Sequence, residues 1–259
     1  MLLAVDVGNT QTVLGVFEAR ELVWHWRIAT QRERTADELA LMFGGFLEQA
    51  GLSFSRQITA VVLASVVPAQ TQALREMVRN YFHFLPVVVE PGIKTGISIQ
   101  TDNPKEVGAD RIVNAVGAFA KYGGPCVVVD FGTAITYDAV SEEGEYLGGA
   151  IAPGVQVSAA GLSSVADRLP RVEVVAPRSV IGKNTVEALQ SGLLLGTASE
   201  VDGMVERMQK ELGGHATVVA TGGLADVVVP LCQSVDHHEP WLTLEGLRLI
   251  FEKNTARDE

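Results

Sequence analysis

The sequence has few cysteines, no long uncharged hydrophobic run and a shortage of basic side chains. Its two cysteines, Cys126 and Cys232, cannot build a disulfide framework, so we expect free thiols in a reducing cytoplasm. No segment approaches the roughly 20 uncharged apolar residues that cross a bilayer, and we expect no membrane partner. Asp6 interrupts the first apolar run, so we also expect no signal peptide.

The charge balance is acidic, with 20 Lys and Arg residues against 31 Asp and Glu residues and a formal net charge of −11. This disfavours nucleic acid as a partner, because a nucleic-acid-binding protein concentrates Lys and Arg to displace counterions. It remains compatible with a small anionic substrate held by a few local donors. The 47% hydrophobic and 20% charged residues are typical of a globular chain, and 259 residues suffice for one large domain or two ordinary ones.

The opening stretch predicts a buried strand, a tight turn and a second strand. Residues 2–7 are apolar and partly β-branched, with Asp6 near the strand's end. Gly8 lets the backbone bend, and residues 9–12 line the turn with small polar groups. Such a hairpin suits a phosphate and its divalent ion. Taken alone, it is equally compatible with an ordinary hairpin whose Asp and Asn make the turn.

The same design recurs at residues 126–137, where an apolar run is followed by Asp130, then Gly132 and Thr133. The repeat predicts two similar halves that face each other across a cleft. Residues 123–125, Gly-Gly-Pro, are a strong breaker, so we expect domains at 1–123 and 124–259, with the last helix able to pack back on the first domain.

The order of predicted elements indicates the fold class. In the first half, three strands, a helix, a strand, a helix and a strand are expected at 2–7, 11–17, 21–30, 35–50, 58–67, 70–82 and 86–89. A capping box from Thr35 to Glu38 opens the first of these helices. This is the order of a ribonuclease-H-like domain.

A helix from Pro104 to Tyr122 is expected before the second half. That half then repeats the three-strand start at 126–130, 133–140 and 145–152, followed by helical segments, with the longest at 184–212, a strand at 216–220 and an amphipathic tail at 242–253. We therefore predict an α/β protein with two ribonuclease-H-like domains.

Two such halves, each opening with an Asp-x-Gly turn, resemble the superfamily of sugar kinases, actin and the 70-kDa chaperones. This resemblance implies the actin-like ATPase fold, with a nucleotide cleft between the two domains. The resemblance implies that the first turn holds the terminal phosphates and the metal, and that the second turn approaches the phosphates from the other side. A late Gly-Gly turn would meet the adenosine, and Gly222-Gly223 follows a predicted buried strand as that role requires.

Five motifs narrow the resemblance over essentially the whole chain to type III pantothenate kinase. They lie at 6–10, 103–111, 130–134, 182–185 and 242–247. The resemblance implies ATP-dependent phosphorylation of pantothenate to 4'-phosphopantothenate, the first step of coenzyme A biosynthesis, by a cytoplasmic homodimer. Alternatives are a non-catalytic nucleotide-binding regulator on the same scaffold and a kinase of a different small hydroxy acid.

The resemblance also implies the nucleotide site. Asp6 would hold Mg²⁺ on the phosphates of ATP, and Asp130 would bind a monovalent cation, K⁺ or NH₄⁺. The residues implied in ATP binding are Asp6, Val7, Gly8, Asn9, Thr10, Gln11, Thr12, Val13, Thr133, Gly222 and Gly223. A polar turn with a metal suits phosphoryl transfer, which depends mostly on positioning and charge neutralisation.

Gly108, Ala109, Asp110, Arg111 and Thr185 are implied in binding pantothenate. Asp110 would be the catalytic residue, which orients the attacking hydroxyl and accepts its proton. From the residues alone, an exposed Asp–Arg pair on a helix and a helix cap at Thr185 remain open.

One position departs from the family, which usually places a substrate-contacting Tyr seven residues before Gly108. Here that position is Thr101. A Walker loop and a zinc site are two other interpretations that the residues do not support. Residues 182–185 lack the upstream glycine of a Walker loop, and His237-His238 fit no standard zinc spacing.

Overall fold

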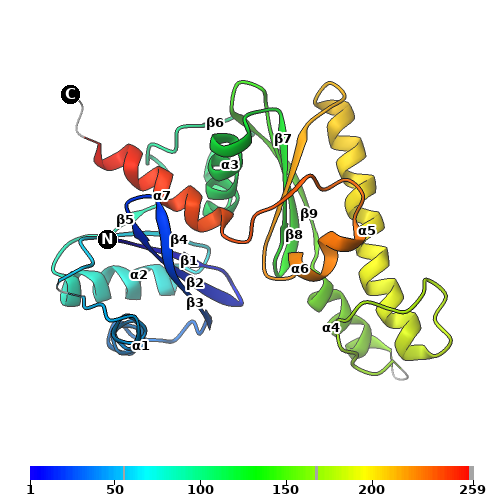
Figure 1. Cartoon of the computed structure of the whole chain (residues 1–259), viewed down its shortest axis with the longest axis horizontal. Helices are drawn as coiled ribbons and strands as arrows, with labels where there is room; N and C mark the ends of the chain where they lie inside the picture. Colours follow the sequence, from blue (N-terminus) through cyan, green and yellow to red (C-terminus); the bar gives the residue numbers. More distant parts are fainter. Residues whose placement is uncertain (55, 167–168, 257–259) are drawn as a thin grey trace. The chain divides into compact units, whose positions relative to one another are not determined.

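The computed structural model describes residues 1–54, 56–166 and 169–256 (Figure 1). The chain forms two compact units. The first comprises Met1–Gly96, Asn103–Gly117 and Thr243–Glu259, and the second comprises Ile97–Asp102 and Ala118–Leu242. This division differs from a single boundary at residue 123, because the C-terminal segment and a short internal segment exchange between the halves.

The first unit is built on a five-stranded sheet. Its strands are β1 (Leu2–Val7), β2 (Gln11–Glu18), β3 (Glu21–Ala29), β4 (Ala60–Ser65) and β5 (Val87–Val88). Their order is β3-β2-β1-β4-β5, with β1, β4 and β5 parallel and β2 and β3 antiparallel to their neighbours. This is the ribonuclease-H-like arrangement that the order of elements predicts, and β1 lies at its centre.

Two helices cover one face of this sheet, as Figure 1 shows below the strands. They are α1 (Ala36–Gln49) and α2 (Pro68–Met77), which continues as a π-helical turn, η1 (Val78–Phe82). The predicted capping box opens α1, with Glu38 N donating to Thr35 Oγ1 at 3.3 Å and Thr35 N donating to Glu38 Oε2 at 2.8 Å. Apolar residues of both helices and of β1, β2 and β4 form one core.

The last helix, α7 (Leu242–Thr255), packs within the first unit. A Cβ at Gly15 of β2 would lie 2.6 Å from Leu244 Cδ1, and the Arg248 guanidinium lies 5.8 Å from the centre of the Phe17 ring. Thr243 Oγ1 donates to Asn114 Oδ1 at 2.7 Å. These contacts place α7 on the other face of the sheet from α1 and α2.

The second unit repeats the sheet with one addition. Its strands are β6 (Ser98–Ile99), β7 (Cys126–Phe131), β8 (Ala134–Val140), β9 (Glu145–Pro153), β10 (Thr217–Thr221) and β11 (His237–His238). Their order is β11-β10-β7-β8-β9-β6. The run β9-β8-β7-β10-β11 matches β3-β2-β1-β4-β5, so the repeated Asp-x-Gly turn belongs to a repeated sheet, and β6 is added beside β9.

The helical segments described after β9 are α4 (Val155–Val165), α5 (Thr185–Glu211), α6 (Ala225–Val228) and the 3₁₀ turn η3 (Val229–Leu231). Apolar residues of α5 and α6 bury the face of the sheet that carries Val127, Val129 and Tyr137. Burial raises the pKa of the Cys126 thiol to about 12 and, with Asp202 nearby, that of the half-buried Cys232 to about 12, so both thiols are poor nucleophiles.

The predicted helix from Pro104 to Tyr122 is divided in the structure. Residues Pro104–Glu106 form a 3₁₀ turn, η2, and α3 begins only at Ala109 and ends at Tyr122. Val107 between them is extended, with φ −71° and ψ 125°. The α-helix therefore begins five residues after Pro104, the residue at which the sequence predicted its start. His237 and His238 form a short edge strand that pairs parallel to β10.

No helix in the described parts of the chain is long and apolar enough to cross a membrane.

Candidate active site

The turn between β1 and β2 closes on its own backbone. Gly8 N donates to Gln11 O at 3.0 Å, and a Cβ at Gly8 would lie 3.1 Å from the same oxygen. A larger residue would crowd this contact, which explains the glycine. Asn9, Thr10 and Gln11 are exposed, so the turn presents polar residues to solvent.

Asp6 lies where this turn leaves the sheet. It is half-buried and pairs with Val13 of β2 and Ala64 of β4, so both neighbouring strands hold its backbone. Val7 is 1% exposed and belongs to the core, so only its backbone is available to a ligand. The structure thus keeps the Asp6 carboxylate at the end of the central strand.

Thr12 supports the turn from inside. It is 4% exposed, and its Oγ1 lies 2.8 Å from Thr30 Oγ1. Thr30 N donates to Thr10 O at 2.9 Å. Thr12 was predicted as an ATP-binding residue, and in the structure its side chain ties the turn to the end of β3.

A cation that the motifs did not indicate also lies at this turn. Arg32, in the loop after β3, donates from Nη2 to Asn9 Oδ1 at 3.4 Å. The sequence signal was weak, because an Arg in a polar segment between a strand and a helix is typical of an exposed loop. Only the pairing of β2 with β3 brings it to the turn.

The motif at 103–111 places Asp110 in the first turn of α3. A Cβ at Gly108 would lie 2.5 Å from Asp110 Oδ1, so the carboxylate folds back over the glycine. The same oxygen accepts a hydrogen bond from Arg111 N at 2.8 Å. Burial raises the pKa of Asp110 above its ordinary value, and this effect outweighs the opposing hydrogen bond and the Arg111 charge.

Packing brings this helix start close to the end of β1. A Cβ at Gly108 would lie 3.8 Å from Val66 Cγ1, and Val66 N donates to Val7 O at 3.0 Å. Val66 therefore lies between Gly108 and Val7 and contacts both. Val7 is the residue after Asp6. Ala109 and Arg111 are half-buried beside it. The first unit thus brings together the turn predicted to bind phosphate and the predicted catalytic carboxylate, which are about a hundred residues apart in sequence.

The second unit contains the other turn. Gly132 N donates to Ala134 O at 3.1 Å, and Gly154 N, at the start of α4, donates to Thr133 O at 3.1 Å. Asp130 is half-buried and pairs with Thr136 and Thr221. The two hairpins therefore share their design, although residues 8–11 connect the first pair of strands and only residues 132–134 connect the second.

The Gly222-Gly223 turn lies against Asp130. Gly222 has φ +99°, and a Cβ there would lie 2.4 Å from Asp130 Oδ1 and 2.5 Å from Phe131 N. Leu224 N then donates to Phe131 O at 3.1 Å. The residues predicted for adenosine and for the monovalent cation are thus neighbours, and only glycine fits at 222.

Thr185 and Thr101 lie elsewhere in the second unit. Asn184 caps α5 by accepting from Glu187 N at 2.9 Å, so the cap that Thr185 could have supplied is made by its neighbour. Thr185 itself is exposed. Thr101 follows β6, and its Oγ1 is buried without a hydrogen-bond partner. Its methyl group lies 3.7 Å from where a Cβ of Gly148 would be.

His237 and His238 have local partners. The His237 ring stacks on Tyr122 with centroids 4.1 Å apart, and His238 Nδ1 lies 3.7 Å from Asp226 Oδ1. Within the described residues, no three His, Cys, Asp or Glu side chains gather as a metal site.

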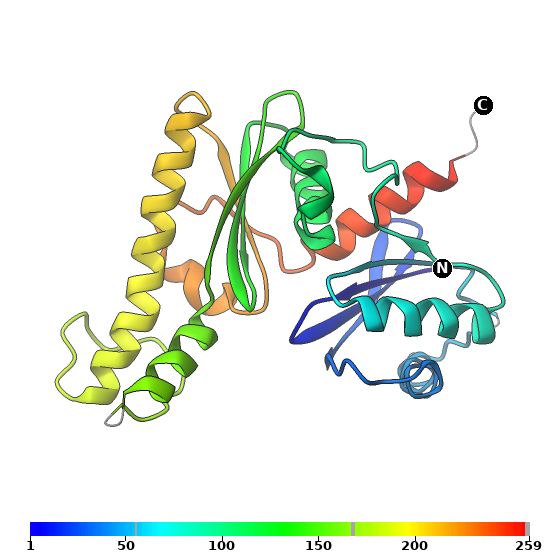
Figure 2. The ribbon, with the colours of Figure 1, turned by 180° about the vertical axis from the view of Figure 1, so that it is seen from behind.

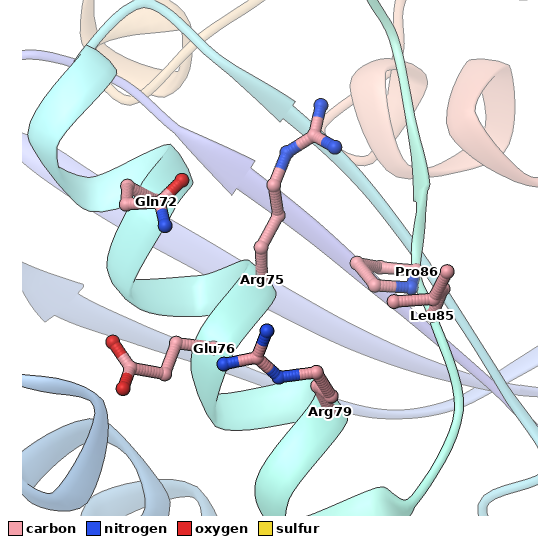
Figure 3. A pocket seen from close by; sticks show the side chains of 6 residues that line it. All are labelled: Gln72, Arg75, Glu76, Arg79, Leu85 and Pro86. Atoms are coloured by element: carbon pink, nitrogen blue, oxygen red, sulfur yellow. The ribbon is translucent and has the colours of Figure 1, made fainter.

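A pocket of about 270 Å³ is lined by side chains of α2 and η1 and by the segment before β5 (Figure 3). Its lining residues are Gln72, Arg75, Glu76, Arg79, Leu85 and Pro86. None of the predicted site residues is among them, and Arg75 is already paired with Glu90 at 2.6 Å.

Comparison with solved structures defines the class of protein. Component A of (R)-2-hydroxyglutaryl-CoA dehydratase from Acidaminococcus fermentans aligns with a TM-score of 0.56 at 16% identity, over 96% of this chain and 95% of that one. The ROK hexokinase of Thermus thermophilus aligns with a TM-score of 0.53 at 14% identity, over 96% and 97%. With its duplicated sheet and paired turns, the chain is a two-domain protein of the actin-like ATPase and sugar-kinase fold, which confirms the predicted fold class.

The sequence comparisons are more specific. The family model described as type III pantothenate kinase matches residues 2–207. A type III pantothenate kinase of Streptomyces griseus is 53% identical over 264 residues, which cover 99% of this chain and 100% of the relative. This chain belongs to the type III pantothenate kinase family.

We predict that Gly222→Ala destabilises the protein more than Gly213→Ala. Both glycines have a positive φ, +99° and +97°, but nothing lies within 4 Å of a Cβ at Gly213. The left-handed strain of about 1–2 kcal/mol is common to both variants. The clash with Asp130 and Phe131 adds about 1–3 kcal/mol at Gly222 alone. Urea unfolding measures the difference, and equal losses would show that the turn yields without cost.

Proposed function

We propose that the protein phosphorylates pantothenate with ATP to give 4'-phosphopantothenate, the first step of coenzyme A biosynthesis. One observation carries the proposal. Two of the family's motifs, at 6–10 and 103–111, lie together in the first unit, with Asp110 held at the start of α3 beside the strand that carries Asp6. The oxygen of the substrate hydroxyl attacks the γ-phosphorus of ATP. The bond to the β–γ bridging oxygen breaks, ADP leaves with the electron pair, and Asp110 accepts the hydroxyl proton.

At the phosphate end, Asp6 and the turn at 8–11 fit a Mg²⁺–phosphate group. A carboxylate is a ligand that Mg²⁺ prefers, and the exposed residues Asn9, Thr10 and Gln11 can donate hydrogen bonds to phosphate oxygens. When bound, the metal neutralises the charge that develops on the transferred group. The residues' own part is to hold the phosphates in a fixed orientation, because the backbone of the turn is already closed.

Asp110 and Arg111 act on the other substrate. Asp110 holds the hydroxyl in line for attack, and its raised pKa brings it closer to that of a proton acceptor working near neutral pH. Arg111 follows directly and offers a fork of donors to the carboxylate or amide oxygens of pantothenate. Gly108 and Ala109 leave room because their side chains are small or absent.

Asp130, Thr133 and the Gly222-Gly223 turn serve the nucleotide in the second unit. We assign K⁺ or NH₄⁺ to Asp130, since a hard cation prefers oxygen ligands and this carboxylate is half-buried beside backbone. Thr133 is exposed at the tip of its turn and available to ATP. The glycines at 222 and 223 let the backbone approach the adenosine closely.

We assign Thr185 and Thr101 to the binding of pantothenate. Thr185 is free of the capping role, which Asn184 performs, so its exposed hydroxyl is available to substrate. At Thr101 the buried, unsatisfied Oγ1 is an acceptor and donor that a bound ligand or water could satisfy. A kinase for a different small hydroxy acid remains the second candidate, because this residue stands where the family usually has Tyr.

We further propose a homodimer that works in the cytoplasm. Apolar side chains are exposed on α4, on the segment after it and at the start of α5, which lie side by side in both views (Figures 1 and 2). They include Val157, Leu162, Val165, Val175, Val180, Ile181 and Val186. An apolar surface of this kind is typical of a protein–protein interface. The two unpaired thiols suit a reducing compartment.

We predict that Asp110→Asn lowers kcat by about 10²–10⁴-fold, since it removes the proton acceptor while keeping the shape of the side chain. Burial raises the pKa of Asp110, so the wild-type rate falls with decreasing pH at a higher pH than for an ordinary aspartate. A coupled ADP-release assay across pH measures both effects, and a near-normal rate in the variant would refute the role.

The raised pKa of Asp110 also determines how the free energy of unfolding changes with pH. Because the folded-state pKa of Asp110 is raised, its contribution to stability is present below the unfolded-state pKa and is lost as the pH rises through the folded-state value. Asp110→Asn should therefore be at least as stable as the wild type at neutral pH, and thermal unfolding serves as the control for intact folding.

We predict that replacing K⁺ by Na⁺ at constant ionic strength lowers turnover about tenfold, a change of about 1.4 kcal/mol in the barrier. Asp130→Asn should be slow in both salts and no longer distinguish them. Asp226→Asn is the matched control, since Asp226 is an exposed carboxylate of the same unit. Equal wild-type rates in K⁺ and Na⁺ would contradict a selective site at Asp130.

We predict that the double variant Val157→Asp/Val165→Asp sediments as a monomer at concentrations where the wild type is a dimer, because two buried charges would be uncompensated at the interface. Leu41→Asp, on an α1 side chain that is 79% exposed, should leave the dimer intact. If the wild type is a monomer at assay concentration, the proposed homodimer is wrong. If the double variant is still a dimer, the interface lies on another surface.

A further inference from the structure

The loop between β3 and α1 is attached to the phosphate turn. Thr30 N donates to Thr10 O at 2.9 Å, and the hydroxyls of Thr12 and Thr30 lie 2.8 Å apart. Both contacts lie within the first unit and join the beginning of the loop to residues on either side of the turn's tip. The loop therefore does not move independently of the site that we propose for the phosphates.

Gln70 holds the same loop further along. Its side chain is 3% exposed, and its Nε2 donates to Arg32 O at 3.2 Å and to Arg34 O at 3.1 Å. A buried amide that uses both of its N–H donors on two carbonyls of one loop fixes the path of that backbone. Gln70 comes from α2, so the core of the unit determines where residues 32–34 lie.

The two arginines of this loop point to different partners. Arg34 donates to Gln31 Oε1 at 3.1 Å and to Ala29 O at 3.3 Å, both in its own loop or the strand before it. Arg32 donates from Nη2 to Asn9 Oδ1 at 3.4 Å, across to the tip of the phosphate turn. Its guanidinium is exposed, in a chain whose net charge is −11.

We propose that Arg32 binds the phosphate oxygens of the nucleotide held at residues 8–11, and that Gln70 is the positioning residue for it. The inference rests on the proposed function and adds a residue to it. The long contact with a neutral amide is weak, and a phosphate would replace it with a shorter, charge-assisted pair of hydrogen bonds. The planar fork of Arg fits two phosphate oxygens at once, and its charge opposes the charge on the group in transfer.

The test compares Arg32→Ala and Arg32→Lys with the matched control Arg34→Ala. Calorimetric titration with Mg·ADP and with a non-hydrolysable Mg·ATP analogue, without pantothenate, measures binding directly. Arg32→Ala should weaken nucleotide affinity and lower kcat/KM for ATP about tenfold or more, with KM for pantothenate unchanged. Arg32→Lys should recover part of the loss, and Arg34→Ala should match the wild type.

Salt dependence separates a phosphate contact from a structural role. Wild-type nucleotide affinity should fall more steeply with ionic strength than that of Arg32→Ala, because a cation–phosphate contact is screened by salt. Gln70→Leu should also weaken nucleotide binding, and in the double variant with Arg32→Ala the two losses should not add, as expected for residues acting through one contact.

The inference would be overturned if Arg32→Ala had the same nucleotide affinity and turnover as Arg34→Ala. It would also be overturned if the nucleotide affinities of the wild type and of Arg32→Ala depended equally on ionic strength. If the wild type binds nucleotide but does not phosphorylate pantothenate, the proposed function fails while calorimetry still decides the role of Arg32. Arg32 is exposed, so its variants should fold. They test whether Arg32 binds the nucleotide phosphates even if Gln70→Leu does not fold.

Discussion

The structure depends on one constraint, a carboxylate held at the end of a central strand where the next turn must begin. Asp6 is paired with Val13 on one side and Ala64 on the other, and Asp130 is paired in the same way with Thr136 and Thr221. Antiparallel and parallel neighbours together fix the backbone of each Asp. Neither carboxylate can therefore withdraw from the edge of its sheet, and the turn that follows has to close within a few residues.

Different contacts hold the turn after the Asp in the two units. In the first, four residues make the turn, and the loop after β3 is bonded to it through Thr30. In the second, the turn is one residue shorter, and the backbone at Gly222 packs directly on Asp130. Residues 9–11 at the tip of the first turn are thus exposed, as the proposed binding of a polyphosphate requires. The second is closed around its carboxylate, which suits a small cation.

Asp110 shows how packing changes the protonation behaviour of one member of an ordinary pair of charged residues. On an exposed helix, its carboxylate would be solvated and its neighbour Arg111 would hold its pKa low. Here the helix starts against Val66, and the carboxylate folds over Gly108. Burial then outweighs the nearby positive charge, and the pKa of Asp110 rises. The glycine is what permits this, since any side chain at 108 would occupy the place of the carboxylate.

The sequence alone determined the repeated fold, the capping box at Thr35 and the family, because periodicity, caps and motifs are local and survive without knowledge of contacts. It misplaced the start of α3, since an extended Val107 follows a proline that usually opens a helix. Only the tertiary structure decided that Thr12 turns inward to Thr30, that Gly222 lies on Asp130, and that Arg32 reaches Asn9. Each of these depends on strand pairing or on a buried side chain from a distant element, which no local pattern records.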